Sequence, residues 1–143
     1  MKILVEIGRF IVTALAVAVS AVLLMTLISQ FIGGAMTFEA FFGLTGIAFV
    51  FAVVGGVIFG LPTLWFAKSL DWDRQVLKLS VLGMAAGLIC GVALTIPAYG
   101  STGAFEYPKE ILPFWTGLGA FSGLIAAQVW YWLHRTDWIN EDA

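Results

Sequence analysis

Residues 80–98 read SVLGMAAGLICGVALTIPA, an apolar stretch in which Gly83, Gly87 and Gly91 recur at intervals of four. On an α-helix, residues four apart lie on the same face, so these glycines form one smooth stripe. Inside a membrane such a stripe allows a neighbouring helix to approach to backbone contact, because no side chain stands between them. The stretch therefore predicts a membrane-spanning helix whose glycine face packs closely against another helix.

The rest of the chain is also apolar. Of the 143 residues, 61% are hydrophobic and 11% are charged, against about half and about a quarter in soluble domains. Four long intervals contain no Asp, Glu, Lys or Arg: residues 10–38, 40–67, 79–105 and 111–134. A membrane-spanning helix needs about 20 mainly apolar residues. We therefore predict an all-α membrane protein, a single four-transmembrane-helix domain over residues 1–143 with spans at about 10–32, 43–67, 76–98 and 112–134.

The basic residues are distributed unevenly between the two ends of these spans. If the spans alternate in direction, all but one fall on the same side of the membrane: Lys2, Arg9, Lys68, Arg74, Lys78 and Arg135. Lys109 falls on the other side. By the positive-inside rule the richer side is cytoplasmic. We therefore predict two antiparallel helical hairpins in a bacterial inner membrane, with both termini in the cytoplasm.

Small residues form similar faces on two other spans. Gly56 and Gly60 project together from the second span, and Gly119 and Gly123 from the fourth. Large side chains project from the opposite sides of these spans, as expected where they face lipid. The seven glycines of the three spans are therefore predicted to form the packing seam within the bundle. A dimer interface at the stripe of residues 83–91 is the alternative.

Two features are expected to modify the helices. Pro62 lies within the second span and removes a backbone hydrogen bond, which predicts a kink near residues 58–62. Thr63 is available to satisfy the carbonyl that the proline leaves without a donor. In the loop before the third span, Asp71 or Asp73 is a candidate N-cap for the next helix.

Few polar side chains lie within or next to the spans. Gln128 is expected to project away from the glycine face of the fourth span. Its amide then either reaches the membrane interface or bonds to another subunit, which makes Gln128 a possible partner contact. His134 is expected to be hydrated at the interface. Cys90 near mid-bilayer has no companion cysteine, and a structural role is expected for it.

Composition also restricts the classes of function. Proton-coupled transporters rely on ionisable groups inside the membrane, and the four apolar intervals contain no Asp, Glu, Lys or Arg. No Ser/His pair, paired carboxylates or metal-ligand cluster predicts an enzyme, and we expect no catalytic residue, cofactor or metal. The net charge of −2 gives no reason to expect nucleic-acid binding.

The sequence therefore favours a non-enzymatic integral membrane protein that serves as an accessory or assembly partner of a membrane complex. Its expected partners are the lipid bilayer and either another membrane protein or copies of itself. Two alternatives stay open. One is an oligomeric small-solute transporter or channel with a path lined by Gln128, Ser80 and Thr63. The other is a bacteriocin-type immunity or membrane-protection protein.

Overall fold

The computed structural model describes the backbone of residues 2–31, 34, 37–100 and 108–141, and within these ranges every regular element is helical. The elements are α1 (Lys2–Phe31), α2 (Phe38–Gly55), the π-helical turn η1 (Gly56–Gly60), α3 (Leu61–Ser69), α4 (Val76–Gly100) and α5 (Pro108–Glu141). Four stretches of the described chain are long and apolar enough to cross a membrane, with α2, η1 and α3 together forming the second.

The helices extend beyond the predicted spans at several ends. α1 begins at Lys2 rather than near residue 10, and α5 runs from Pro108 to Glu141 rather than over residues 112–134. Apolar composition marks the part of a helix that suits the hydrocarbon core, whereas the hydrogen-bonded backbone can continue into the polar region. The longer α1 brings Glu6 within 3.0 Å of His134 on α5. The sequence between the predicted third and fourth spans, residues 99–111, lies partly outside the described residues.

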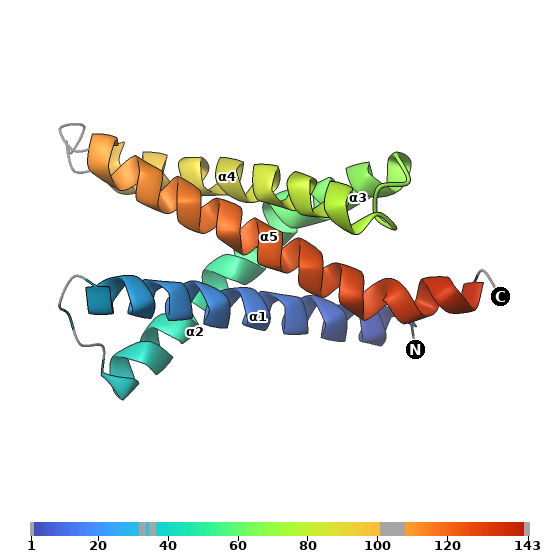
Figure 1. The fold of residues 1–143 in the computed structure, drawn as a ribbon, viewed down its shortest axis with the longest axis horizontal. Coiled ribbons are helices and arrows are strands. Elements are labelled where there is room, and N and C mark those ends of the chain that lie inside the picture. Colours follow the sequence, from blue (N-terminus) through green and yellow to red (C-terminus); the bar gives the residue numbers. More distant parts are fainter. Residues whose placement is uncertain (1, 32–33, 35–36, 101–107, 142–143) are drawn as a thin grey trace.

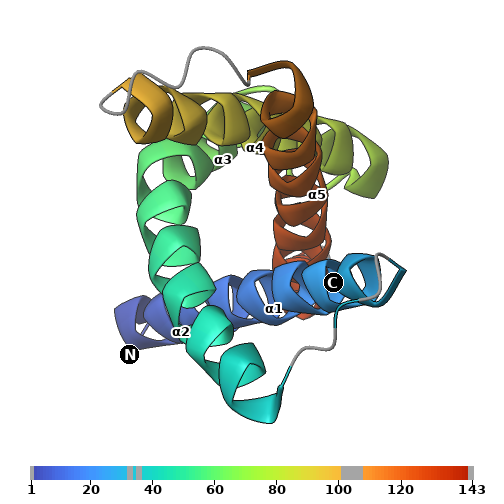
Figure 2. The same cartoon turned by 90° about the vertical axis from the view of Figure 1, so that its left-hand side faces the viewer.

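The helices surround a central region. In Figure 1, α1 and α4 lie on opposite sides, while α5 and the α2–α3 segment cross obliquely between them. Figure 2, turned by 90°, shows α1, α2, α4 and α5 arranged as the four sides of a ring. α5 packs along α4 and also contacts α1, and α1 contacts α2. Both chain ends and the connection between α3 and α4 lie at the same end of the molecule in Figure 1.

α4 and α5 touch through their glycine faces. A Cβ atom built at Gly83 would lie 2.5 Å from the carbonyl oxygen of Gly123. One built at Gly87 would overlap the carbonyl of Gly119, and one at Gly119 would overlap the carbonyl of Gly87. The backbones of α4 and α5 are therefore in direct contact. Any residue larger than glycine at these positions would push the two helices apart. The glycine face of α4 is occupied within the chain.

The remaining glycines of the predicted seam have different surroundings. A Cβ at Gly91 would lie 2.5 Å from the carbonyl oxygen of Trp115, again on α5. A Cβ at Gly56 would meet the ring of Phe10 at 3.0 Å, so this position packs against a side chain of α1. In the described part of the chain, no atom lies within 4 Å of a Cβ built at Gly60. Close approach of a neighbour therefore accounts for glycine at every one of these positions except Gly60.

A small core joins α3, α4 and α5 near the end that carries the chain termini. Its buried members are Ala67, Leu79, Ala127 and Trp130, and the partly buried Leu64, Trp72, Leu82 and Tyr131 pack against them. Ala67 is fully buried and Leu79 is 2% exposed. This cluster attaches the short α3 to the α4–α5 pair.

The second span is irregular where the proline predicted it to be. The N–H of Leu61 bonds to the carbonyl of Gly56, five residues back, which defines the π-helical turn. Pro62 follows in the first turn of α3, where its missing N–H costs least. The hydroxyl of Thr63 donates to the carbonyl of Phe59 at 2.6 Å, rather than to the carbonyl four residues before the proline.

The prediction that Asp71 or Asp73 caps α4 is wrong. Gln75 occupies the N-cap position, because its carbonyl accepts the first helical hydrogen bond, from the N–H of Leu79 at 2.9 Å. Asp71 instead has a φ of 52°, in the left-handed region that Asp tolerates better than most residues. Its carbonyl accepts a hydrogen bond of 3.4 Å from the side-chain amide of Gln75. The aspartate therefore forms the turn and does not cap the helix.

The glycine contact predicts opposite effects for one substitution at two sites. Gly87→Ala forces α4 and α5 apart and should lower the free energy of unfolding by about 1–3 kcal/mol, the usual cost of overpacking. Gly46→Ala in α2, where the described atoms leave open space around the new methyl group, should raise it by about 0.5–1 kcal/mol through helix propensity. Thermal unfolding of both variants in one detergent measures the difference. Equal midpoints would contradict the close contact.

Candidate functional site

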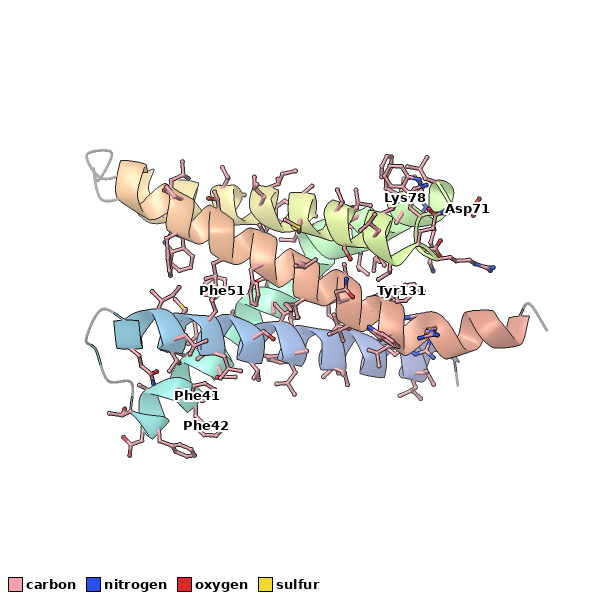
Figure 3. All side chains as sticks on the ribbon, viewed as in Figure 1. Phe41, Phe42, Phe51, Asp71, Lys78 and Tyr131 are labelled. Atoms are coloured by element: carbon pink, nitrogen blue, oxygen red, sulfur yellow. The ribbon has the colours of Figure 1, made fainter. Side chains whose placement is uncertain are left out.

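The spans surround a cavity of about 360 Å³ that is partly open to the outside of the bundle. Its lining follows α1 from Phe10 to Met25 and α5 from Trp115 to Trp130. Residues of α2, η1, α3 and α4 complete the wall, so every span contributes. The cavity lies inside the ring of helices that Figure 2 shows end-on. Phe51 of α2 is part of the lining and lies between α1 and the α4–α5 pair in Figure 3.

The lining is almost entirely hydrocarbon. None of its described residues carries a charge. The hydroxyl of Thr13 donates to the carbonyl of Arg9 at 2.8 Å, and that of Thr63 donates to its own helix as well. Ser122 contributes the third hydroxyl, and Cys90 a thiol. Apolar cavities of this kind stay dry, because a water molecule needs two to four polar partners.

The cavity is partly open, so apolar groups from outside the chain can enter it. The cavity also exceeds the engineered apolar cavity of about 150 Å³ that binds benzene. Its volume falls in the range of small-ligand pockets, about 300–1,000 Å³.

The seven glycines singled out by spacing all belong to this lining: Gly56, Gly60, Gly83, Gly87, Gly91, Gly119 and Gly123. Most of these glycines direct their Cβ positions at the facing helix of the α4–α5 pair and not at the cavity. The rest of the lining combines small residues such as Ala52 and Ala86 with large ones such as Phe51. The spacing of small residues predicted the packing faces of single spans and did not indicate a cavity between the spans.

Gln128 bonds within the chain and lies outside the described lining of the cavity. Its Nε2 donates to the hydroxyl of Ser80 at 2.6 Å, a contact between α5 and α4. The Ser80 hydroxyl in turn donates to the carbonyl of Val76 at 2.6 Å, and Ser80 itself is buried. The amide therefore has one partner across the α4–α5 seam, and the contact of Gln128 with another subunit stays a prediction.

His134 is buried, not hydrated as expected from the sequence. Its Nδ1 lies 2.9 Å from the carbonyl oxygen of Trp130, and its Nε2 lies 3.0 Å from Oε2 of Glu6. The ring also stacks on Trp130, with centroids 4.2 Å apart. Both ring nitrogens therefore lie within hydrogen-bond distance of an oxygen atom. The expectation failed because α1 and α5 continue past the predicted spans and meet there.

The carboxylate of Glu6 also contacts a basic residue of its own helix. Nη1 of Arg9 lies 3.2 Å from Oε1 of Glu6, one helical turn away, so the carboxylate uses its two oxygens for two partners. Glu6 thus ties the start of α1 to the last part of α5. Among the described residues, no group of three His, Cys, Asp or Glu side chains is placed to hold a metal ion. The Glu6–His134 contact is most simply a structural tie.

Comparisons add no relative to this description. No protein-family model, no curated protein and no solved structure matches the chain.

The Ser80–Gln128 bond should be measurable as a coupling energy. We expect Ser80→Ala and Gln128→Leu to destabilise the protein singly, and the double variant to lose less than the sum of the two. The coupling expected for such a bond between membrane helices is about 0.6 kcal/mol, reaching about 1.7 kcal/mol in the strongest cases. A double-mutant cycle of unfolding in detergent measures it, and strict additivity would show that the bond is absent.

Removing the carboxylate of Glu6 should loosen the first turns of α1. We expect Glu6→Ala to cost about 1 kcal/mol or less, as partly exposed ion pairs do, and to speed amide hydrogen exchange over residues 3–9. Glu39→Ala is the matched control, because Glu39 is exposed on α2 and should leave exchange at residues 3–9 unchanged. Two outcomes would argue against the tie to His134: exchange at residues 3–9 that speeds up equally in both variants, or exchange there that speeds up in neither variant.

Proposed function

We propose that the chain is a small non-enzymatic protein of the bacterial inner membrane that serves as an accessory or assembly partner of a membrane complex. It would be threaded as two antiparallel helical hairpins with both termini in the cytoplasm. The observation that carries the proposal is the exposed aromatic end of α2, which no other part of the described chain covers.

This end of α2 stands apart from the bundle. None of the described residues of α2 is buried, and in Figure 1 its first turns diverge from the other helices. Phe38 is 78% exposed and Phe42 58%. The rings contact one another, with centroids 4.7 Å apart for Phe38–Phe42 and 5.7 Å apart for Phe41–Phe42. Figure 3 shows Phe41 and Phe42 at this projecting end.

Such a cluster suits recognition by another membrane protein. Aromatic side chains bury large areas with few rotatable bonds, and they dominate contact energies where a partner offers a pocket. Gly43 and Gly46 follow directly, and a Cβ at either would meet no described atom within 4 Å. A partner helix could therefore approach α2 closely beside the aromatic cluster.

Charge supports the proposed threading. The predicted cytoplasmic side carries six of the seven basic residues. In Figure 1 the two chain ends and the connection between α3 and α4 lie at one end of the molecule. Arg74 belongs to that connection, and Lys68 and Lys78 lie in the helix ends beside it. That arrangement agrees with the one-sided distribution on which the proposal rests.

No observation favours a path for polar solutes. Of the three residues proposed for such a path, Gln128 and Ser80 bond to each other, and Thr63 bonds to its own helix. The cavity presents a hydrocarbon surface, which does not replace the hydration of an ion or polar solute. We therefore give preference to the accessory role.

Site-specific photocrosslinking in native bacterial membranes tests this role. A photoreactive amino acid at Phe42 should give a discrete adduct with one other protein, because the side chain would lie in the contact. The control is the same amino acid at Val81 of α4, which is 62% exposed and should react with lipid. Lipid adducts alone at both positions would refute the proposal. An adduct of twice the mass of the chain would assign this end of α2 to a second copy and would also overturn it.

A further inference from the structure

We propose that the central cavity binds one acyl chain of a membrane lipid. The inference concerns a different part of the molecule from the end of α2 and does not depend on the accessory role. It rests on the shape of the cavity, its chemistry and what surrounds it in a bilayer.

The shape of the cavity suits an extended chain. Fifteen residues separate Phe10 from Met25 along α1, and Trp115 from Trp130 along α5. At about 1.5 Å per residue the lining is about 22 Å long, most of the roughly 30 Å thickness of a hydrocarbon core. A volume of about 360 Å³ spread over this length describes a narrow, elongated cavity, which suits one extended acyl chain better than a compact ligand.

The chemistry of the cavity selects the hydrocarbon part of a lipid. The described lining has no charge to bind a phosphate or an amine. The hydroxyls of Thr13 and Thr63 are bonded to their own helices, so they offer little to a polar ligand. A headgroup would therefore stay at the membrane surface while its chain occupies the cavity. Burying the chain costs little, because the cavity is as apolar as the bilayer core that the chain leaves.

The protein cannot easily fill the space itself. The backbones of α4 and α5 are already in contact at Gly87 and Gly119, so neither helix can move closer to the other. The inward face of α1 carries small residues, Ala14, Ala18 and Ala21, that are buried in their present packing. The cavity is partly open, and lipid chains surround four spans as apolar as these in a membrane.

Photolabelling by a lipid chain tests the proposal on the whole protein. The wild-type chain is reconstituted into vesicles of phosphatidylethanolamine and phosphatidylglycerol. The vesicles contain a trace of phosphatidylethanolamine with a diazirine midway along one acyl chain. After irradiation and digestion, mass spectrometry maps the adducts. We expect adducts on inward residues of the lining, such as Ala86 and Ala126, in addition to those on outward residues such as Ile89.

A matched pair of variants gives the control. Ala86→Phe places a ring in the cavity, whereas Ala85→Phe places the same ring on the adjacent, exposed position of α4 outside the lining. We expect loss of the inward adducts in Ala86→Phe only, with adducts on Ile89 kept in both. Ala52→Phe, on the opposite wall, serves if Ala86→Phe does not fold. Adducts confined to outward residues in the wild type would overturn the proposal, as would inward adducts that persist in the filled variant.

Discussion

The direct contact between the backbones of α4 and α5 is the constraint on which the rest of the bundle depends. Between helices in a lipid environment there is no hydrophobic driving force, so association relies on dispersion at close range. Glycines on both helices make that range available. Once α5 is fixed on α4, Trp130 meets Ala67 of α3 and His134 meets Glu6 of α1. The α4–α5 contact thus positions Trp130 and His134, through which α5 contacts α3 of the second span and α1, the first span.

The seam and the open centre of the molecule are separate features of the packing. Cβ atoms built at Gly83, Gly87, Gly119 and Gly123 would meet the backbone of the facing helix, so these glycines set the distance between α4 and α5. The cavity beside them is lined by large side chains such as Phe51 as well as by small ones such as Ala52. Fixing one pair of helices in backbone contact therefore leaves the other spans to enclose the centre with whatever side chains face it.

Part of this structure could be predicted from the sequence. Features set by residues close in sequence were predictable, whereas contacts between residues far apart in sequence were not. Four apolar spans and their glycine faces are local properties, which follow from composition and from a spacing of four residues. The partners of Gln128 and His134 lie 48 and 128 residues away, and no local pattern specifies them. Helix ends were also misjudged, because hydropathy reports the membrane-compatible part of a helix. The cavity was missed since it belongs to no single face.

The π-helical turn in the second span allows the two parts of that span, α2 and α3, to face different neighbours. A π turn accommodates one residue more than an α-helical turn, so the residues after it are rotated by about 100° relative to an uninterrupted helix. α2 therefore contacts α1, while α3 directs Ala67 towards α4 and α5. Removing one residue from Gly56–Gly60 would restore a regular helix and turn Ala67 away from Leu79. The length of this turn is thus part of the fold: it sets the rotational register between the two halves of the molecule.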